Sequence, residues 1–322
     1  MSYKVLIPSD ITSAGKEYLK EHDCEITVLD DSSVENICRN VADADAILAR
    51  TEDYPAEVFE AAKKLKVIGR YGSGVDNIDL EAARRHGVQI CYTPFANANS
   101  VAEHTMMLIL ACAKNAVLQD KACRAGDFAS RNRNRGFELE GKTLGLIGCG
   151  NIGRLVAKKA AYGFDMKVIG YDAYVDPAKI PDYIQLKDCE DDIYREADFI
   201  SLHVPLVKDT RRMIGKAALD KMKTTAYVIN CARGGVIDEE ALYDAVSSGR
   251  IAGAGLDVFE SEILDMGKPL DSESPLFTLE QIVVSPHNAA LTIEACDRMG
   301  IHAAQGIVEV LTGRKPTWPV NY

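Results

Sequence analysis

The stretch "TLGLIGCGNIGRLVAKKAAYG", residues 143–163, decides the fold. Its apolar start predicts a buried strand, and its second half predicts a helix. Between them stand Gly148, Gly150 and Gly153 in the spacing G-x-G-x-x-G. By itself the spacing is a weak signal, but between a strand and a helix it is typical of a dinucleotide-binding turn. We expect Gly148 to permit the tight turn, Gly150 to let a pyrophosphate approach, and Gly153 to permit close packing of helix on strand.

The residues after this turn indicate which dinucleotide binds. Asn151 and Ile152 would open the helix, where backbone N–H groups and the helix dipole favour phosphates. Asp172 ends the next predicted strand and no arginine follows it directly. A carboxylate there accepts hydrogen bonds from ribose hydroxyls and repels a 2′-phosphate. We therefore expect NAD rather than NADP, the alternative being that Asp172 is an ordinary solvated strand end.

Apolar runs alternate with amphipathic helical stretches almost throughout the chain, which predicts an α/β protein with parallel sheets covered by helices. The first series of expected strands covers 3–7, 24–29, 45–49, 67–71 and 89–92. The second covers 143–147, 167–171, 198–203, 226–230, 252–258 and 281–285. Six strands is the number that a full dinucleotide-binding domain needs.

The positions of two expected helices indicate where the domains meet. Ser100 and Glu103 have the spacing of a capping box, which would start a long apolar helix that joins the domains or packs at a subunit interface. A last helix, at about 292–311, is surplus to the nucleotide domain and should cross back to complete the first one. We expect a discontinuous domain, 1–99 with 288–322, around a nucleotide domain at 100–287. The segment "RNRNRG", 131–136, reads as a basic loop.

The composition excludes several classes of protein. With 322 residues, 47% hydrophobic and 26% charged, two globular domains are expected. The net charge of −11 argues against nucleic acid or an anionic membrane as partner. The nine cysteines contain no C-x-x-C pair, which argues against zinc, any other metal site or a redox dithiol and favours a reducing cytoplasm. We expect neither a signal peptide nor a membrane span, because no apolar run is long enough.

Charged side chains follow the later predicted strands. Arg233 follows 226–230, in "YVINCARGGVID", and His287 follows 281–285, in "VVSPHNAA". Asp257, Glu260 and Glu262 lie at or after 252–258. If the strands are parallel, their carboxyl ends share one sheet edge with the glycine turn, and open α/β sheets bind ligands at that edge.

These groups suit the reduction of a 2-oxo acid. Arg233 would grip the carboxylate bidentately. His287 would donate a proton to the developing alkoxide. A carboxylate beside the imidazole would raise its pKa, and from the residues alone Glu262 and Glu260 both remain candidates for it. The simpler interpretations are a structural ion pair for Arg233 and a helix cap for His287. His203 would shape the cofactor pocket, and His104 reads as a packed or interface histidine.

Along essentially its whole length the sequence resembles the D-isomer-specific 2-hydroxyacid dehydrogenase family. The stretches that carry the resemblance are "GRYGSGVDNID" (69–79), "NSVAEH" (99–104), "GKTLGLIGCGNIGR" (141–154), "HVPLVKDT" (203–210), "NCARGGVIDEEAL" (230–242), "GAGLDVFESE" (253–262) and "SPHNAA" (285–290). The resemblance implies a flavodoxin-like substrate domain built from both chain ends, a Rossmann NAD-binding domain between them, and a homodimer with the helix after Ser100 near its interface.

The same resemblance implies roles for single residues. It selects Glu262 over Glu260 as the partner of His287, with Arg233 as the third catalytic member. It puts Cys231 and Asp257 against the nicotinamide ribose and carboxamide. The remaining expected contacts are His203 and Pro205 to the cofactor, and Ser73 and Gly74 to the substrate. Asn288 departs from the glycine-rich or apolar continuation that is common in the family, and we expect its polar side chain to face the substrate. We expect no C-terminal regulatory domain, and Glu262, where formate dehydrogenases have Gln, argues against formate oxidation.

Two hypotheses follow for the function. The first is an NAD-dependent dehydrogenase of a small D-2-hydroxy acid. One possible substrate is phosphorylated, such as 3-phosphoglycerate, and would need extra cations, for which Arg50 and then the 131–135 arginines are the candidates. The other is a compact acid of the lactate, glycerate or 2-hydroxyglutarate type. The second is an NAD(H)-responsive scaffold related to the C-terminal binding proteins, which the expected absence of long disordered tails disfavours.

Overall fold

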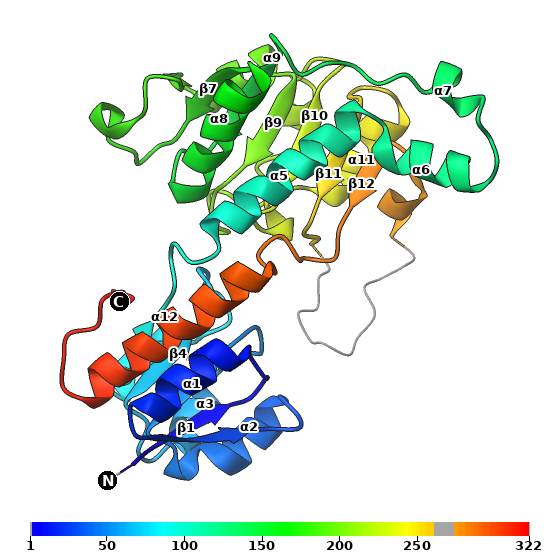
Figure 1. The fold of residues 1–322 in the computed structure, drawn as a ribbon. Coiled ribbons are helices and arrows are strands. Elements are labelled where there is room, and N and C mark those ends of the chain that lie inside the picture. The colour runs from blue at the N-terminus through cyan, green and yellow to red at the C-terminus, as the bar shows by residue number, and fades with distance from the viewer. Residues whose placement is uncertain (1, 261–273, 322) are drawn as a thin grey trace. The chain divides into compact units, whose positions relative to one another are not determined.

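A computed structural model describes residues 2–260 and 274–321 of the chain (Figure 1). Contacts between Cα atoms divide these residues into two compact units. The first unit combines residues 2–98 with 290–321, and the second combines 99–260 with 274–289. Each unit is therefore built around a sheet of its own.

The first unit is a five-stranded parallel sheet in the order β2-β1-β3-β4-β5. Its strands are β1 (Tyr3–Ile7), β2 (Cys24–Val28), β3 (Ala46–Ala49), β4 (Val67–Arg70) and β5 (Gln89–Cys91). Its helices are α1 (Ser13–Glu21), α2 (Val34–Asn40), α3 (Ala56–Ala61), α4 (Leu80–Arg85) and α12 (Ile293–Leu311), with a 3-10 turn at Val41–Asp43. The order 2-1-3-4-5 is that of flavodoxin-like folds.

Helices cover both faces of this sheet, because successive side chains of a strand point to opposite faces. Val67 of β4 belongs to the core beneath α1 and α12, whereas its neighbour Ile68 belongs to the core beneath α2, α3 and α4. Figure 1 shows α12 lying beside α1. The last long helix of the chain thus packs onto the first sheet.

The second unit is a seven-stranded parallel sheet in the order β12-β11-β10-β9-β6-β7-β8. Its strands are β6 (Thr143–Ile147), β7 (Lys167–Tyr171), β8 (Gln185–Leu186), β9 (Phe199–Leu202), β10 (Tyr227–Asn230), β11 (Gly253–Leu256) and β12 (Ile282–Val284). Counted from β6, the order is 3-2-1-4-5-6 with a seventh strand at the edge, so the unit is a Rossmann fold. The predicted α/β class with two doubly wound sheets is confirmed.

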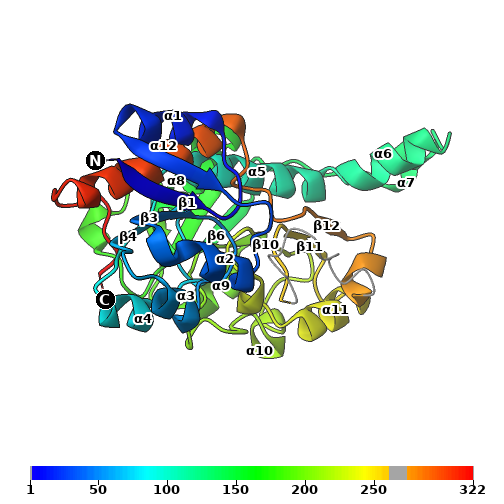
Figure 2. The ribbon, with the colours of Figure 1, turned by 90° about the horizontal axis from the view of Figure 1, so that it is seen from below.

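The helices of the second unit also lie on two faces. They are α5 (Ala98–Ala113), α6 (Ala116–Arg124), α7 (Ser130–Arg133), α8 (Asn151–Phe164), α9 (Glu190–Glu196), α10 (Lys216–Leu219) and α11 (Glu239–Ser247). Three 3-10 turns, at Pro177–Lys179, Gly234–Val236 and Pro275–Thr278, complete the unit. Helices α5 and α8 share one core with the sheet, and α9, α10 and α11 share the other. Figure 2 shows α6 and α7 continuing beyond the end of α5.

No single helix among the described residues is long and apolar enough to span a membrane. Helices α5 and α6, taken as one pair bent by 62°, pass the same test of length and composition.

Three details differ from the sequence expectations. Six strands were expected in the second sheet, and β8 was missed because it has two residues and pairs only along β7. The predicted capping box is wrong: α5 begins at Ala98, and the Ser100 hydroxyl inside it donates to the Ala289 carbonyl at 2.6 Å. The basic segment 131–136 is not wholly a loop, since Ser130–Arg133 forms α7.

Candidate active site

The carboxyl ends of six parallel strands of the second sheet lie in one register row. The final residues of these strands, in sheet order, are Val284, Leu256, Asn230, Leu202, Ile147 and Tyr171. The residues that follow them, in the same order, are Ser285, Asp257, Cys231, His203, Gly148 and Asp172. The expectation that the strands are parallel and bring their carboxyl ends to one edge is confirmed.

The glycine turn leaves no room for side chains at two of its three glycines. Gly148 has φ of +98°, and a Cβ there would meet the His203 carbonyl oxygen at 2.6 Å. A Cβ on Gly153 would meet the Gly148 carbonyl oxygen at 2.3 Å. A Cβ on Gly150 would instead meet nothing within 4 Å. The open space lies at the N-terminus of α8, where Asn151 and Ile152 form the first turn, so the turn fits a phosphate.

Asp172 braces the glycine turn from the neighbouring strand. Its Oδ2 accepts the backbone N–H of Cys149 at 2.8 Å, and its Oδ1 accepts that of Tyr174 at 2.9 Å. A carboxylate has about four lone-pair sites, so two of these hydrogen bonds leave acceptor capacity for another donor. The position expected to read the ribose therefore also fixes the turn.

His203 lies beneath the glycine turn. Its backbone N–H donates to the Ile147 carbonyl at 2.8 Å, and its Nε2 is 2.9 Å from the Ser201 hydroxyl oxygen. Burial lowers the pKa of the imidazole to about 4, so the ring is neutral at neutral pH. The exposed Pro205 follows, and its carbonyl accepts the Thr210 hydroxyl at 2.6 Å.

The segment after β10 holds Arg233 by its backbone. Asn230 accepts the Ala232 N–H at 3.0 Å and donates to the Arg233 carbonyl at 2.9 Å, which closes a tight bend. The Arg233 Nη1 donates to the Ala232 carbonyl at 2.8 Å. Gly234 follows, and a Cβ there would be 1.9 Å from the Phe259 backbone, so only glycine fits. At Cys231, burial is the main cause that raises the thiol pKa to about 12, so the thiol is not a reactive nucleophile.

Asp257 organises the segment that carries His287. The side chain of Asp257 is 1% exposed, and its carboxylate accepts the Ser285 hydroxyl at 2.6 Å and the backbone N–H groups of Asn288 and Ala289 at 3.0 and 2.9 Å. Its own carbonyl accepts the His287 N–H at 2.8 Å. Burial raises the pKa of Asp257, but hydrogen bonds from His104, Ser285 and these N–H groups outweigh it and hold the pKa below its ordinary value.

His104 is a residue of this site that sequence reasoning treated only as a packed or interface histidine. Its Nε2, on α5, is 2.8 Å from the Ser285 hydroxyl oxygen and 3.4 Å from Asp257 Oδ1. His104 is 181 positions from Ser285 in the chain, so no local pattern links the two. The signals in the sequence were a histidine in a largely apolar helix and its place in the stretch "NSVAEH" (99–104).

Three other residues were expected near the substrate or beside His287. Glu262 lies outside the described residues. Glu260, its competitor, pairs with Arg212 at 2.8 Å. The Asn288 side chain is exposed.

Three further expected substrate residues belong to the first unit. Arg50 follows β3, donates to the Asp10 carbonyl at 2.8 Å, and has its guanidinium 5.7 Å from the centre of the Tyr71 ring. Ser73 and Gly74 are half-buried in the segment after β4. All three thus follow carboxyl ends of strands in their own sheet.

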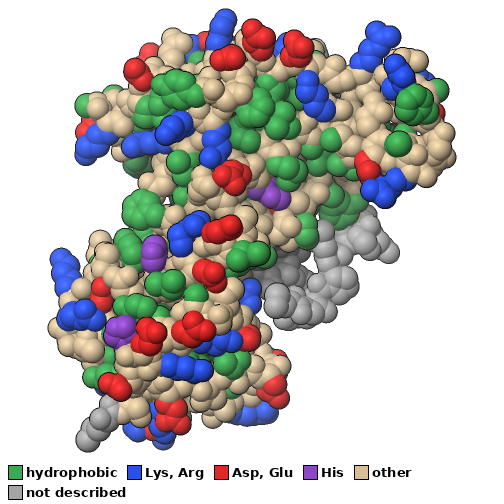
Figure 3. All heavy atoms as spheres, in the orientation of Figure 1, with side chains coloured by type: hydrophobic (Ala, Val, Ile, Leu, Met, Phe, Trp, Pro, Cys, Tyr) green, Lys and Arg blue, Asp and Glu red, His purple; other side chains and the backbone are tan. Residues whose placement is uncertain are grey.

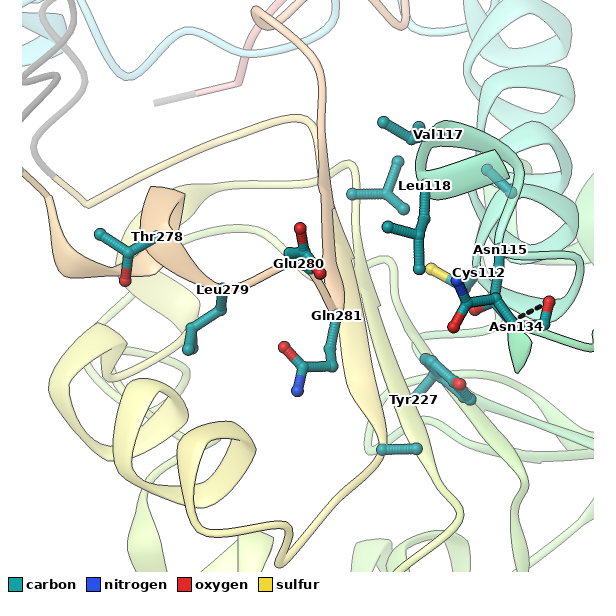
Figure 4. Close-up of a pocket in the computed structure, with 13 residues that line it drawn as sticks. Cys112, Asn115, Val117, Leu118, Asn134, Tyr227, Thr278, Leu279, Glu280 and Gln281 are labelled. Atoms are coloured by element: carbon teal, nitrogen blue, oxygen red, sulfur yellow. Dashed lines mark hydrogen bonds between the residues drawn. The ribbon is translucent and has the colours of Figure 1, made fainter. Parts of the chain in front are cut away.

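A cavity of about 420 Å³ lies at the other end of β10, β11 and β12 (Figure 4). Tyr227, Ala252 and Gln281, which line it, stand at the amino ends of these strands. Cys112 and Leu118 close it from α5 and α6. Because the glycine turn and His287 follow carboxyl ends, this cavity is not part of the candidate active site.

Comparison with known proteins agrees with this geometry. Residues 106–289 match the family model described as D-isomer specific 2-hydroxyacid dehydrogenase, NAD binding domain. A hydroxypyruvate reductase of Thermotoga maritima is 42% identical over 280 residues, which cover 86% of this chain and 88% of the relative. The chain belongs to the D-isomer-specific 2-hydroxyacid dehydrogenase family. Its cofactor is accordingly NAD, which the open glycine turn and Asp172 fit.

Other members of this dehydrogenase family are similar over the whole chain. A D-3-phosphoglycerate dehydrogenase of Methanocaldococcus jannaschii is 42% identical over 321 residues, which cover 99% of this chain but 59% of the relative. This chain therefore spans little more than half the length of that relative. The structure of D-lactate dehydrogenase with NAD⁺ from Lactobacillus jensenii superposes with a TM-score of 0.82 at 28% identity, covering 99% of this chain and all of the other.

Proposed function

We propose that this chain is an NAD-dependent dehydrogenase that interconverts a small D-2-hydroxy acid and its 2-oxo acid. The observation that carries the proposal is the shared sheet edge. Arg233 and His287 each stand three residues beyond the same register row that the glycine turn follows. Arg233, as a cation for a carboxylate, and His287, as a proton donor, then lie at the same edge as the NAD-binding turn.

Each side chain has one role in the proposed reduction. Arg233 binds the substrate carboxylate through two N–H groups and orients the neighbouring carbonyl. NADH supplies a hydride to the carbonyl carbon. His287 donates its proton to the carbonyl oxygen, so that a hydroxyl forms and neutral imidazole remains. Glu262 is the proposed carboxylate partner that orients the imidazole.

The proposed cofactor contacts follow the register row. Backbone N–H groups from Gly150 to Gly153, with Asn151 and Ile152 among them, bind the pyrophosphate. Those of Gly148 and Cys149 already donate to the Tyr171 carbonyl and the Asp172 carboxylate. Asp172 accepts the adenosine ribose hydroxyls. His203 and Pro205 line the pocket, and Cys231 and Asp257 border the nicotinamide half. The support for these roles is the position of each residue one to six places beyond the end of a strand.

We also propose a substrate domain with bounds 1–99 and 288–322, which contains the first unit and also Asn99, Asn288 and Ala289 of the second. Ser73 and Gly74 offer backbone N–H groups to the carboxylate, and Asn288 contacts the rest of the substrate. Arg50 is the candidate for a phosphate because its guanidinium stands at a strand end of that unit. The names of the two 42% identical relatives contain phosphoglycerate and hydroxypyruvate, one phosphorylated acid and one not.

Oxidation of NADH, followed at 340 nm with a panel of 2-oxo acids, tests the function. The panel includes pyruvate, hydroxypyruvate, 3-phosphohydroxypyruvate and 2-oxoglutarate, and the reverse reaction is run with paired D and L acids. We expect turnover with at least one acid and for the D form only. Tight NADH binding without turnover of any acid would contradict the proposed dehydrogenase activity and favour an NAD(H)-responsive scaffold. Turnover of L acids would contradict the assigned stereochemistry.

The phosphate question has its own variant. If the substrate is phosphorylated, Arg50→Gln raises KM for 3-phosphohydroxypyruvate by about tenfold or more, because an anion loses a cation partner, and leaves that for hydroxypyruvate nearly unchanged. Arg84→Gln, at an exposed arginine of α4 in the same unit, serves as the control with the same loss of charge. Equal effects on both substrates would assign Arg50 to the carboxylate or to the fold.

A homodimer is the proposed assembly. A groove of about 1000 Å³ runs along α5 and α8 and is lined by Met106, Met107, Leu110, Leu155, Tyr162 and Phe164. Met107 is 43% exposed and Tyr162 67%. Figure 3 shows hydrophobic side chains gathered there beside basic ones, and Lys114, Lys158 and Lys159 line the groove. Light scattering after size exclusion should give a dimer that Met107→Glu weakens and Ile293→Glu, on α12, does not. A monomeric wild type would refute it.

The proposed location is the cytoplasm. All nine cysteines are free thiols, and none is paired although several are buried. Free thiols persist in reducing compartments. Fractionation of the source cells with an antibody to the chain tests the location, and recovery outside the cytoplasmic fraction would contradict it.

A further inference from the structure

A second layer of side chains lies behind the segment that carries His287. His104 on α5, Ser285 after β12 and Asp257 after β11 come from three separate elements and meet within hydrogen-bond distance. The His104 side chain is 15% exposed and that of Asp257 1%. Polar groups buried to this degree are costly unless they hydrogen-bond, so the cluster has to be satisfied as a unit.

The chemistry of the three groups fixes the direction of their protons. An ionised carboxylate only accepts hydrogen bonds, so the Ser285 hydroxyl donates its single proton to Asp257. The Ser285 oxygen is then an acceptor toward His104, whose Nε2 must carry a hydrogen. The relay runs from His104 Nε2–H to the Ser285 hydroxyl and from there to the Asp257 carboxylate.

Asp257 passes this constraint on to the catalytic segment. Its carboxylate accepts the N–H groups of Asn288 and Ala289, and its carbonyl accepts that of His287. His287 itself has φ of +49°, in the left-handed region that few non-glycine residues adopt. A residue stays there only where its surroundings hold it, and these hydrogen bonds surround it on both sides.

We propose that His104 is a positioning residue for His287, acting through Ser285 and Asp257 to hold the 285–289 segment in the conformation that aims the imidazole. The inference rests on the proposed function, in which His287 donates a proton to the substrate. His104 supplies an N–H that orients the Ser285 hydroxyl toward Asp257.

A pair of variants separates the hydrogen bond from simple packing. His104→Phe keeps a ring of similar size and removes the donor, whereas His104→Gln keeps an N–H near the position of Nε2. We expect His104→Phe to lower kcat about 10- to 100-fold, because small misplacements of a catalytic group cost that much, and to leave KM for NADH within about twofold. His104→Gln should recover most of the loss. His86→Phe, on an exposed histidine of the first unit, is the control.

Amide hydrogen exchange provides a readout that does not depend on turnover. We expect the N–H groups of His287, Asn288 and Ala289 to exchange at least tenfold faster in His104→Phe than in wild type, because their local opening becomes easier. Ser285→Ala breaks the same relay with a smaller change of shape and should show the same acceleration. Combined with His104→Phe, it should add little further effect.

The results that would overturn the inference are distinct from those that would overturn the function. Wild-type kcat in His104→Phe, or a His104→Gln as impaired as His104→Phe, would remove the positioning role. Unchanged exchange at 287–289 in both His104→Phe and Ser285→Ala would remove it as well. If wild type turns over no 2-oxo acid, the proposed function fails, and faster exchange in the variants would still establish the relay.

Discussion

The carbonyl oxygen of Asp257 accepts the backbone N–H of His287 at 2.8 Å, so the proposed proton donor is tied directly to the end of β11. Because Asp257 N–H donates in turn to the Asn230 carbonyl at 2.9 Å, the tie continues to the strand that precedes Arg233. The backbone segments that carry Arg233 and His287 are thereby both held by hydrogen bonds to the same sheet. That arrangement fixes a distance between cation and proton donor that two independent loops would not.

Replacement of His287 tests the proton donor. His287→Asn and His287→Ala should both lower kcat by about 10² to 10⁴-fold while NADH still binds, since general acid catalysis is lost and the glycine turn is untouched. Asn tolerates a left-handed backbone better than Ala, so it is the less perturbing of the two. NADH binding is measured by fluorescence titration. Near-normal turnover of His287→Asn would exclude His287 as the acid.

Asp172→Ala tests how the turn distinguishes NAD from NADP. We expect the ratio of kcat/KM for NADH over NADPH to fall by about tenfold or more, because the carboxylate that repels a 2′-phosphate is gone. NADH affinity should fall too, since Asp172 also holds the Cys149 N–H. Asp182→Ala removes the same charge elsewhere in the unit and should change neither value. An unchanged ratio would mean that another group reads the ribose.

Replacing two glycines of the turn with alanine should have different effects. Gly153→Ala forces a Cβ against the Gly148 carbonyl at 2.3 Å, so it should lower the free energy of unfolding by about 1–3 kcal/mol. Gly150→Ala places its Cβ in open space and should fold like wild type but bind NADH weakly, because the methyl group occupies the phosphate approach. Urea unfolding and NADH titration measure the two effects. NADH affinity unaffected by Gly150→Ala would move the phosphate elsewhere.

His203 predicts a pH dependence of stability. Its pKa is about 4 in the folded chain against an ordinary value of 6.5, so between these values the unfolded chain binds the proton and the folded chain does not. The free energy of unfolding should therefore fall as pH drops from about 6.5 to 4, by at most about 3 kcal/mol from this residue. His203→Gln, which keeps a donor for Ser201, should show a shallower fall over that window. Urea unfolding of both proteins at pH 7, 5.5 and 4.5 measures this. The same change in the free energy of unfolding with pH in wild type and His203→Gln would contradict it.

The strand ends explain why so much of the site could be predicted. In a parallel sheet the residue after each buried apolar run lies at the same edge, so locating the runs also located Gly148, Asp172 and Asp257. The spacing of the glycines indicated a steric requirement that the backbone contacts at Gly148 and Gly153 bear out. Local pattern sufficed here because the constraints act within one strand, turn and helix.

Where a long-range contact decided the outcome, local pattern failed. Ser100 and Glu103 have the spacing of a capping box, yet the Ser100 hydroxyl bonds to Ala289, far along the chain. Strand β8 is too short to carry an apolar run and exists because β7 offers it a free edge to pair with. Both differences arise from partners that the sequence does not place next to one another.

The sequence by itself determined the two parallel sheets, the NAD turn and the family, because apolar periodicity and glycine spacing are local and steric. Only the tertiary structure decided that His104, Ser285 and Asp257 form one relay behind His287. His104 is far from the other two residues in the chain. The three side chains form hydrogen bonds because α5 packs across the ends of β11 and β12. A buried carboxylate needs donors from whatever element lies beside it, and the packing of the elements selects which ones those are.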